Sequence, residues 1–436
     1  MIRNAVLGRG GIFPDGQSLL KDGRLSFRKH ERCGKKATLN RVPWPPIQSH
    51  QYAWNPKDEV WAFVPPSERI FLHRPYRAAV LPPIANIDIK IPTEINADIV
   101  EATDAIARFD EQMANLPVPM PAILLRTESA SSSQIERITT NARNLAMATL
   151  GLSDKKNAIL VAANVRAMQT ALNLGGAITS ELILAIHHAL LLDSNPEISG
   201  KYRTEQVWIG GEDYSPHHAD FVPPHQKEVS KAIVDLVKYA RRVDIPPLVQ
   251  AAIVHAQFET IHPFEDGNGR TGRVLLQSVL QRRGVTGHAT VPVSAGLLTE
   301  PQSYFAALTA YREGDAAPII ERVCQAALSA TINGKMLVND IMAIRDKWFA
   351  SIPARRDSAA WKLADILFSQ PVVNVEWASR TANLSERTTR NAIDTLVRAG
   401  VLSATNAAKR NRVWQAGEVF AAMDAFAQRA GRRFRG

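Results

Sequence analysis

Residues 262–273 constrain the fold more than any other segment, because they read His-Pro-Phe-Glu-Asp-Gly-Asn-Gly-Arg-Thr-Gly-Arg. Pro263 has no amide hydrogen and ends the apolar helical pattern that precedes it. The glycines that follow expose backbone amides, and helical spacing then puts Arg270 and Arg273 on one face. The segment therefore predicts a helix, a tight loop that can hold an anion, and a second helix that begins at the loop.

The composition is that of a soluble globular protein with more than one domain. The chain has 436 residues, of which 45% are hydrophobic and 22% charged. The longest apolar run, residues 181–192, is too short to span a membrane, and no secretory signal is evident. The two cysteines are far apart and lack metal-ligand spacing, so we expect a cytoplasmic protein without disulfides and without a membrane partner. The net charge of +10 favours a polyanionic partner, either a nucleotide or a nucleic acid.

Helical periodicity dominates the sequence and predicts a mainly α fold. Residues 92–116 place apolar side chains at helical spacing, at Ile95, Ile99, Ala102, Ile106 and Phe109. Further helices are predicted to end at residues 151 and 175, to begin at 179–180, and to run over 248–260. The exception is residues 201–224, where β-forming residues around a Gly-Gly pair predict a hairpin.

Four regions follow from these patterns. Residues 1–42 are predicted to form a basic arm, since residues 1–41 hold ten Lys and Arg against three Asp and Glu. Residues 43–120 form an N-terminal region that begins with irregular structure and short strands, and residues 121–348 form a helical core. Residues 351–357 are interpreted as a hinge into a separate C-terminal module, residues 358–436.

The C-terminal module has the pattern of a winged helix-turn-helix domain. Helices are predicted over residues 359–368, 375–382 and 386–399, followed by a two-stranded wing. The third helix carries Arg387 and Arg390, and the wing carries Lys409, Arg410 and Arg412, so these side chains are candidates for binding double-stranded DNA. Winged helices also bind proteins, and that alternative stays open.

The residue types in 262–273 suit the transfer of a phosphate-containing group. His262 can act as a base on an incoming hydroxyl, and Asp266 offers a hard carboxylate to Mg²⁺, with Glu265 as its rival. Phe264 is expected to anchor the loop in the core. The candidate nucleotide-binding residues are the loop amides and the donors beside them, namely Gly267, Asn268, Gly269, Arg270 and Arg273.

These residues resemble the signature of the Fic family, His-x-Phe-x-Asp/Glu-Gly-Asn-Gly-Arg-x-x-Arg, at every fixed position. Residues 202–210, 221–224 and 256–261 also resemble sequences of this family, and the resemblance covers roughly residues 77–330. It implies a helical core with a β-hairpin flap, and the transfer of AMP from ATP, with Mg²⁺, to a hydroxyl of a target protein. It also implies that His262 is the base, that Asp266 binds Mg²⁺, and that Arg270 and Arg273 bind the β- and γ-phosphates.

Residues 132–137 resemble the family's inhibitory motif, Ser/Thr-x-x-x-Glu-Gly/Asn, with Ser132 and Glu136 at its fixed positions. The resemblance implies that Glu136 pairs with Arg273 and keeps it from the γ-phosphate. Arg137 departs from the motif, because Gly or Asn usually stands there and arginine adopts positive φ poorly. We therefore expect the helix to continue through this position.

Two further assignments rest on the resemblance. Val207, Trp208 and Ile209 correspond to the flap, which would hold a target segment by strand addition, although a hairpin that only covers the core would look the same. Tyr304 corresponds to a position near the nucleotide base, and a tyrosine that faces the core would also fit.

The sequence is compatible with three functions. The leading one is an adenylyltransferase inhibited by Glu136, whose partners are ATP and a target protein that the sequence does not identify. The second is AMP removal, or another nucleotidyl or phosphoryl transfer, on the same fold. The third is a DNA-binding transcriptional regulator whose Fic body senses nucleotide. The sequence leaves open whether the chain forms a homodimer.

Overall fold

The computed structural model describes residues 41–56, 58–62, 64–405 and 412–431. The described part is mainly helical, as the sequence predicts, and contains two small antiparallel sheets. The basic arm predicted for residues 1–42 lies almost wholly outside the described residues. None of the described helices is long and apolar enough to cross a membrane.

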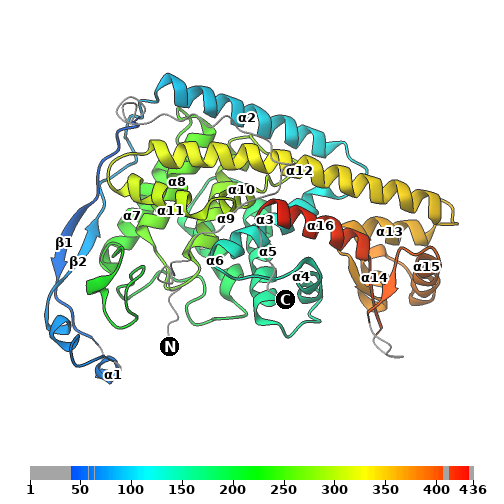
Figure 1. Ribbon diagram of the computed structural model, residues 1–436, viewed down its shortest axis with the longest axis horizontal. Coiled ribbons are helices and arrows are strands. Elements are labelled where there is room, and N and C mark those ends of the chain that lie inside the picture. The colour runs from blue at the N-terminus through cyan, green and yellow to red at the C-terminus, as the bar shows by residue number, and fades with distance from the viewer. Residues whose placement is uncertain (1–40, 57, 63, 406–411, 432–436) are drawn as a thin grey trace, which may run out of the picture.

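Two long helices, α2 (Thr93–Ala114) and α12 (Ala317–Ser351), lie side by side over the rest of the body (Figure 1). The apolar residues predicted to share a face of α2 are all buried. Beneath them lie the remaining helices of the body, which are α3 (Met120–Ile135), α4 (Ala142–Thr149), α5 (Lys156–Leu174), α6 (Ser180–Leu191), α7 (Val229–Ala240), α8 (Pro247–Ile261), α9 (Asn268–Arg282), α10 (Val293–Leu298) and α11 (Pro301–Arg312).

Helix α8 is at the centre of the core. Every residue from 248 to 261 is buried, which is the pattern of a helix surrounded by other elements rather than one that covers a surface. It packs against α7, α9, α11 and α12. Because α8 is fixed on all sides, the loop at its C-terminal end has a rigid support.

Strands β1 (Gln48–Tyr52) and β2 (Tyr76–Val80) pair in register from Gln48–Val80 to Tyr52–Tyr76 and run along one edge of the molecule (Figure 1). The short helix α1 (Asp58–Trp61) and a 3-10 turn, η1 (Arg69–His73), lie between them. Short strands were expected in this region. The segment before β1 joins the body through three backbone bonds, from Ala316 N to Val42 O, from Trp44 N to Gly314 O and from Ile47 N to Arg312 O.

The hairpin predicted for residues 201–224 is wrong in its detail. The segment forms isolated bridges instead of a ladder, and the main one joins Ile209 to Phe221 through bonds of 2.8 and 3.2 Å. Gly210 and Gly211 both have positive φ and turn the chain away from extended geometry directly after Ile209. Two 3-10 turns, η2 (Pro216–His218) and η3 (Gln226–Glu228), occupy the remainder.

The C-terminal segment contains α13 (Ala359–Ser369), β3 (Val372–Asn374), α14 (Val375–Ala382), α15 (Glu386–Arg398), β4 (Ser403–Ala404), β5 (Val413–Gln415) and α16 (Gly417–Arg429). The three predicted helices are confirmed to within one residue. Of the two strands expected after them, β5 lies where it was predicted, whereas β4 begins directly after the expected residues 401–402. Strand β3 and helix α16 were not predicted, and β3 completes a sheet of order β3-β5-β4. Lys409 and Arg410 lie outside the described residues.

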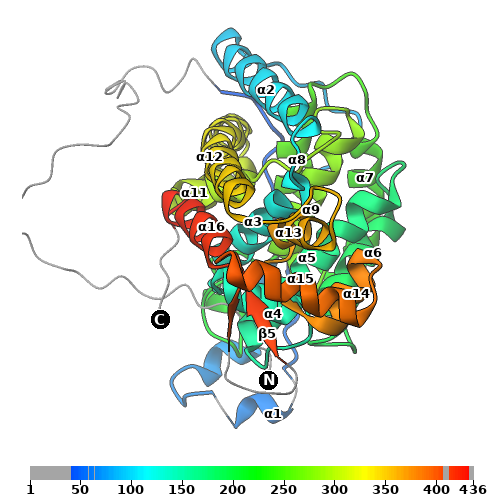
Figure 2. The same cartoon turned by 90° about the vertical axis from the view of Figure 1, so that its right-hand side faces the viewer.

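The C-terminal segment is packed against the body through two of its helices. Helix α16 contacts α12, α4 and α3, and α13 contacts α3 (Figure 2). The ring of Trp348, on the last turns of α12, stacks on Phe368 of α13 with 4.6 Å between their centroids. Residues 352–358, between α12 and α13, therefore connect two parts of the chain that share an apolar interface.

Candidate active site

Residues 262–273 lie where α8 ends and α9 begins. His262 follows the last residue of α8 and has left-handed backbone angles, φ 49° and ψ 61°. Gly267, at φ 76°, directly precedes Asn268, which is the first residue of α9. A Cβ at Gly267 would lie 2.9 Å from Leu190, so both the backbone angle and the space require glycine. The predicted succession of helix, loop and helix is confirmed.

Phe264 holds the loop to the core, as expected. Its ring is fully buried and stacks on the His187 ring, with 3.6 Å between centroids and parallel planes. The Phe264 amide donates to Asn268 Oδ1, and Asn268 Nδ2 donates to the Phe264 carbonyl, both at 2.9 Å. The Asn268 side chain therefore closes the loop with one of its two amide hydrogens, and its contact with a phosphate stays a prediction.

His187 supports the loop from α6, a role that the sequence interpretation missed. The Gly200 amide donates to His187 Nδ1 at 3.0 Å, so the proton of the neutral ring is on Nε2, which donates to the Asp266 carbonyl at 3.0 Å. Burial lowers the pKa of His187 to about 4, which keeps this neutral form in place. A histidine within the apolar stretch 181–192 was the available signal, because a buried imidazole needs partners.

His262 is half-buried beside the loop, and its lowered pKa keeps the imidazole neutral at neutral pH. Burial, aided by the positive charges of Arg203 and Arg312, lowers its pKa to about 3. Its Nδ1 lies 3.4 Å from the Glu259 carbonyl. With the ring proton donated to that carbonyl, Nε2 would be left with a lone pair to accept a proton.

Arg203 connects the loop that begins at His262 to both ends of the segment 201–224. Its side chain is buried and donates to three carbonyls, with Nε to His262 O at 2.9 Å, Nη1 to Glu205 O at 3.0 Å, and Nη2 to Pro224 O. Its own amide donates to Pro263 O at 2.9 Å. Arg203 lies within residues 202–210, which resemble the family, but the sequence predicts no role for it. A buried arginine is rare without such a set of partners, and only the fold shows them.

Glu136 lies across the start of α9 and pairs with both signature arginines. Its Oε2 accepts from Arg270 Nε at 2.9 Å, and its Oε1 accepts from Arg273 Nη2 at 2.7 Å. A Cβ at Gly269 would lie 2.3 Å from Glu136 Oε1, so the glycine is what allows the carboxylate to approach the helix terminus. The pair with Arg273 was expected, whereas the pair with Arg270 was not.

Ser132 also contacts Arg273. Arg273 Nε donates to Ser132 Oγ at 2.8 Å, and Nη2 donates to the Ser132 carbonyl at 2.9 Å. Burial alone would raise the pKa of Glu136, but the charges of Arg270 and Arg273 outweigh it and hold that pKa below its ordinary value. Glu136 is therefore ionised at neutral pH, and the side chains of Ser132, Glu136, Arg270 and Arg273 form one hydrogen-bonded cluster.

The expected continuation of the helix through Arg137 is wrong. Helix α3 ends at Ile135, and Arg137 adopts φ 63°. The Ile138 amide donates to Ser133 O at 3.0 Å, which closes the helix end in the way that a glycine usually does. The tertiary structure here outweighs the local preference of arginine, at a cost of roughly 1 kcal/mol.

Asp266 fits the requirements of a Mg²⁺ ligand. Its side chain is 61% exposed, and only Oδ1 is used in a short bond, accepted from the Gly267 amide at 2.7 Å. Within the described ranges, no group of three or more His, Cys, Asp or Glu side chains could hold a metal ion. One accessible carboxylate suits an ion whose other ligands are phosphate oxygens and water. Glu265, the rival ligand, is half-buried.

Tyr304 faces the core. It is 1% exposed, and its hydroxyl lies 2.8 Å from His255 Nε2. Burial raises its pKa. Tyr304 is thus a buried residue, and its place near a nucleotide base stays a prediction.

Glu259 is a buried carboxyl that the sequence interpretation did not consider. It lies on the last turn of α8, 3.9 Å from Arg273 Nη1, and is 7% exposed. Burial, together with the negative charge of Glu136, raises its pKa to about 7 against the opposing effect of Arg273. Glu259 therefore holds its proton over much of the acid range.

The remaining candidates lie away from this cluster. Val207, Trp208 and Ile209 are half-buried in the bridged segment, where Trp208 Nε1 donates to Glu212 O at 2.8 Å. Arg387 and Arg390 are exposed on α15, and Arg390 pairs with Glu386 one turn earlier at 2.7 Å. Arg412 is exposed directly before β5.

Comparison with known proteins agrees with this geometry. Residues 177–280 match the sequence profile of the Fic/DOC family. The chain is 34% identical over 143 residues to the protein adenylyltransferase fic-1 of Caenorhabditis elegans, which covers 33% of this chain and 26% of that protein. It is 30% identical over 165 residues to the protein adenylyltransferase Fic of Nematostella vectensis, covering 36% and 35%.

A crystal structure of a Fic family protein from Desulfovibrio desulfuricans G20 aligns with a TM-score of 0.49 and 22% identity, over 77% of this chain and 98% of that one. The chain spans about a quarter to a third of the length of the curated relatives named above. It carries a Fic/DOC family domain, and Fic adenylyltransferases are its homologues over that domain.

Proposed function

We propose that this protein is an adenylyltransferase that transfers AMP from ATP to a hydroxyl side chain of a protein, and that Glu136 inhibits it. One observation carries the proposal. A carboxylate of the chain itself lies at the N-terminus of α9, bonded to Arg270 and Arg273, where a bound phosphate would find the same donors. Curated adenylyltransferases that match the Fic domain support the choice of AMP as the transferred group.

The arginines are suited to bind the outer phosphates of ATP once Glu136 is withdrawn. Arg270 Nη1 is buried and has no hydrogen-bond partner among the described residues, so an oxygen placed there would satisfy it. Arg273 is held on the same face of α9 by Ser132. The first-turn amides of α9 have no partners within the helix and would donate to a further phosphate oxygen.

The transfer follows from these positions. His262 Nε2 accepts the proton of the acceptor hydroxyl, and the hydroxyl oxygen bonds to the α-phosphorus. The bond from that phosphorus to the bridging oxygen breaks, and pyrophosphate leaves with the electron pair. Mg²⁺ bound by Asp266 would neutralise charge on the phosphates. The protein otherwise acts by position and charge, without a covalent intermediate.

The inhibition rests on competition for the arginines. As long as Glu136 occupies Arg270 and Arg273, the γ-phosphate has no donors on α9 and the α-phosphorus is not aligned for attack. Hydrogen bonds between charged groups are worth about 1.5–3 kcal/mol each, so the carboxylate is a strong competitor. We assign Ser132 to the same function, because it fixes the orientation of Arg273.

The acceptor would approach along residues 207–209. The single bridge between Ile209 and Phe221 leaves a short stretch of extended backbone beside the loop that Arg203 joins to His262. Pairing with an extended target segment there would read little of its side-chain sequence.

A second function is proposed for residues 358–436, as a winged helix that binds double-stranded DNA. Ser385 caps helix α15 by accepting from the Thr388 amide at 3.2 Å, and the helix presents Arg387 and Arg390 to solvent. Strands β4 and β5 follow α15 in the chain, as the strands of a wing would, and Arg412 lies directly before β5. These exposed cations suit phosphate contacts beside a groove.

The test of the enzyme proposal is incubation of the purified protein with α-labelled ATP and Mg²⁺. The wild type, Glu136→Gly, and the double variant Glu136→Gly with His262→Ala should be compared. We expect strong self-labelling or target labelling only in the single variant. Release of label from pre-labelled protein, without incorporation, would instead support AMP removal. An absence of label transfer in all three, with ATP still bound, would refute the proposal.

A further inference from the structure

The inhibitory glutamate stands in a short connection between two helices that both contact the C-terminal segment. Helix α3 ends at Ile135, α4 begins at Ala142, and Glu136 is the first residue after α3. Helix α13 packs on α3, and α16 packs on both α3 and α4. The position of Glu136 is therefore set by two helices that the C-terminal segment holds.

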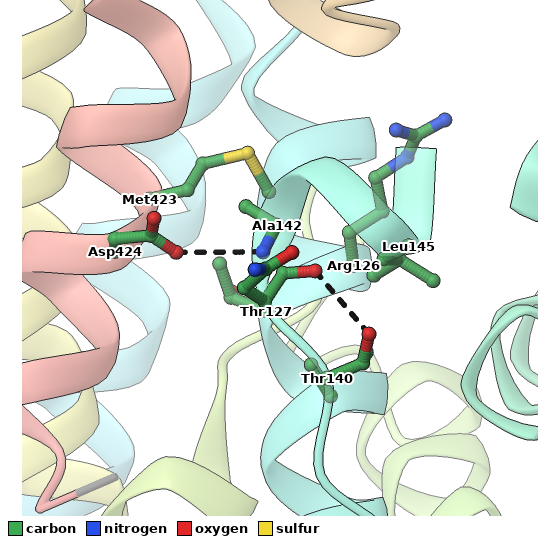
Figure 3. Close-up of a pocket in the computed structure, with 9 residues that line it drawn as sticks. Arg126, Thr127, Thr140, Ala142, Leu145, Met423 and Asp424 are labelled. Atoms are coloured by element: carbon green, nitrogen blue, oxygen red, sulfur yellow. Dashed lines mark hydrogen bonds between the residues drawn. The ribbon is translucent and has the colours of Figure 1, made fainter. Parts of the chain in front are cut away.

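The start of α4 is bonded directly to that segment. Asp424 Oδ1, on α16, accepts from the Ala142 amide at 3.4 Å, as Figure 3 shows. Arg143 Nε donates to Gln415 Oε1 of β5 at 2.7 Å. An aspartate at the N-terminus of a helix also interacts favourably with the helix dipole.

The interface beneath these bonds is buried and closely packed. Gln370 is 2% exposed, donates to the Ala146 carbonyl of α4 at 2.9 Å, and accepts from Arg126 of α3. Ala146 forms a small apolar cluster with Phe420 and two valines of β3 and β5, Val372 and Val413.

The cavity drawn in Figure 3, between α3, α4 and α16, has a volume of about 10 Å³. That is about the room one water molecule needs. The surface is therefore an internal contact and not a ligand site.

The connection itself is strained. Arg137 has φ 63°, a conformation that non-glycine residues adopt at a cost and keep only when the surrounding structure fixes it. Here the fixed ends are the last turn of α3 and the first turn of α4. If the first turn of α4 were released, Arg137 could relax to negative φ, and the direction of the Glu136 side chain would change with it.

We propose that the C-terminal segment holds the inhibited state by anchoring α4 through Asp424, Gln415 and Gln370. This inference rests on the proposed inhibition by Glu136. Detachment of α16 and β5 from α4 relieves the strain at Arg137 and moves the carboxylate away from Arg270 and Arg273. The C-terminal segment is thus a regulator of the active site, and any event that displaces it from α4 activates transfer.

The experiment compares self-labelling with α-labelled ATP among wild type, Asp424→Ala with Arg143→Ala, and Glu136→Gly. The first variant removes the two bonds to α4 and should label roughly tenfold faster than wild type, as loss of two hydrogen bonds predicts. Asp394→Ala is the matched control, because it removes an exposed aspartate from α15, which packs on α13 and α14. It should label as wild type does.

Arg137→Gly provides the sharper test. Glycine accepts φ 63° without strain, so the inhibited geometry no longer needs the anchor. Added to the activated double variant, Arg137→Gly should return labelling towards the wild-type rate. Persistence of full activation in that triple variant would overturn the proposed mechanism.

Hydrogen exchange of residues 134–142 separates this inference from the proposed function. The Asp424→Ala, Arg143→Ala variant should exchange faster there than wild type, whatever the reaction. If Glu136→Gly does not label but this exchange increases, the enzyme assignment fails and the anchoring stands. If Glu136→Gly labels while the anchor variant neither labels faster nor exchanges faster, the anchoring is refuted.

Discussion

Arg203→Met is the substitution that tests most directly how the site is held together. It keeps a long side chain but removes the donors to His262 O, Glu205 O and Pro224 O. Three carbonyls then lose bonds worth roughly 1 kcal/mol each, so the free energy of unfolding should fall by about 3 kcal/mol. Transfer should fall by about 10²-fold, because a displacement of about 1 Å at the reacting groups costs that much.

ATP affinity should change little in the Arg203→Met variant. The loop that would hold the phosphates is closed by its own bonds between Phe264 and Asn268, which the substitution does not touch. The assay is label transfer in the Glu136→Gly background, together with ATP binding by calorimetry and thermal unfolding.

Arg322→Met is the matched control for Arg203. Arg322 is also buried and donates to two carbonyls and a hydroxyl, at Gly296, Leu297 and Thr299, away from the loop. It should lose similar stability and keep its transfer rate. Equal losses of transfer in both variants would show that Arg203 acts only through global stability, which would refute its role in positioning.

The other predictions concern pH, stability and DNA. Burial lowers the pKa of His262 to about 3, so the transfer rate of Glu136→Gly should not fall through protonation of His262 between about pH 8 and about pH 5. A fall in that rate near pH 6.5 would contradict this prediction. Glu259 has its pKa raised from 4.5 to about 7, so the stability it contributes is full below pH 4.5 and is lost as pH rises to about 7. In urea unfolding, Glu259→Gln should make the free energy of unfolding depend less on pH between about pH 4.5 and about pH 7. An unchanged pH dependence in this variant would contradict the raised pKa of Glu259. Arg390→Ala should weaken duplex binding and its salt dependence in fluorescence anisotropy, whereas Arg108→Ala, which removes a similar exposed pair on α2, should not.

The helices were predictable because their signals are local. The apolar spacing of α2, the capping threonine before α6 and the serine cap of α15 each depend on a few neighbouring residues. Helix α16 has the same kind of spacing, at Phe420, Met423 and Ala427, and could have been predicted from it. The resemblance added the pairing of Glu136 with Arg273, which no local pattern contains.

The sequence was insufficient where a residue's conformation or contacts depend on parts of the chain that are distant in sequence. Arg137 adopts positive φ against its own preference, because α3 and α4 fix the connection. The roles of Arg203 and His187 depend on carbonyls that only the tertiary structure brings to them. Such contacts leave no periodic trace in the sequence.

The central claim is that Glu136 competes with the γ-phosphate of ATP for Arg270 and Arg273. The most direct measurement is the rate of label transfer from α-labelled ATP in Glu136→Gly, with and without Arg273→Ala. We predict that the single variant labels far faster than wild type and that the added Arg273→Ala returns the rate to the wild-type level or below. Equal labelling by the single and double variants would mean that freeing Arg273 is not what activates the enzyme, and the account would be wrong.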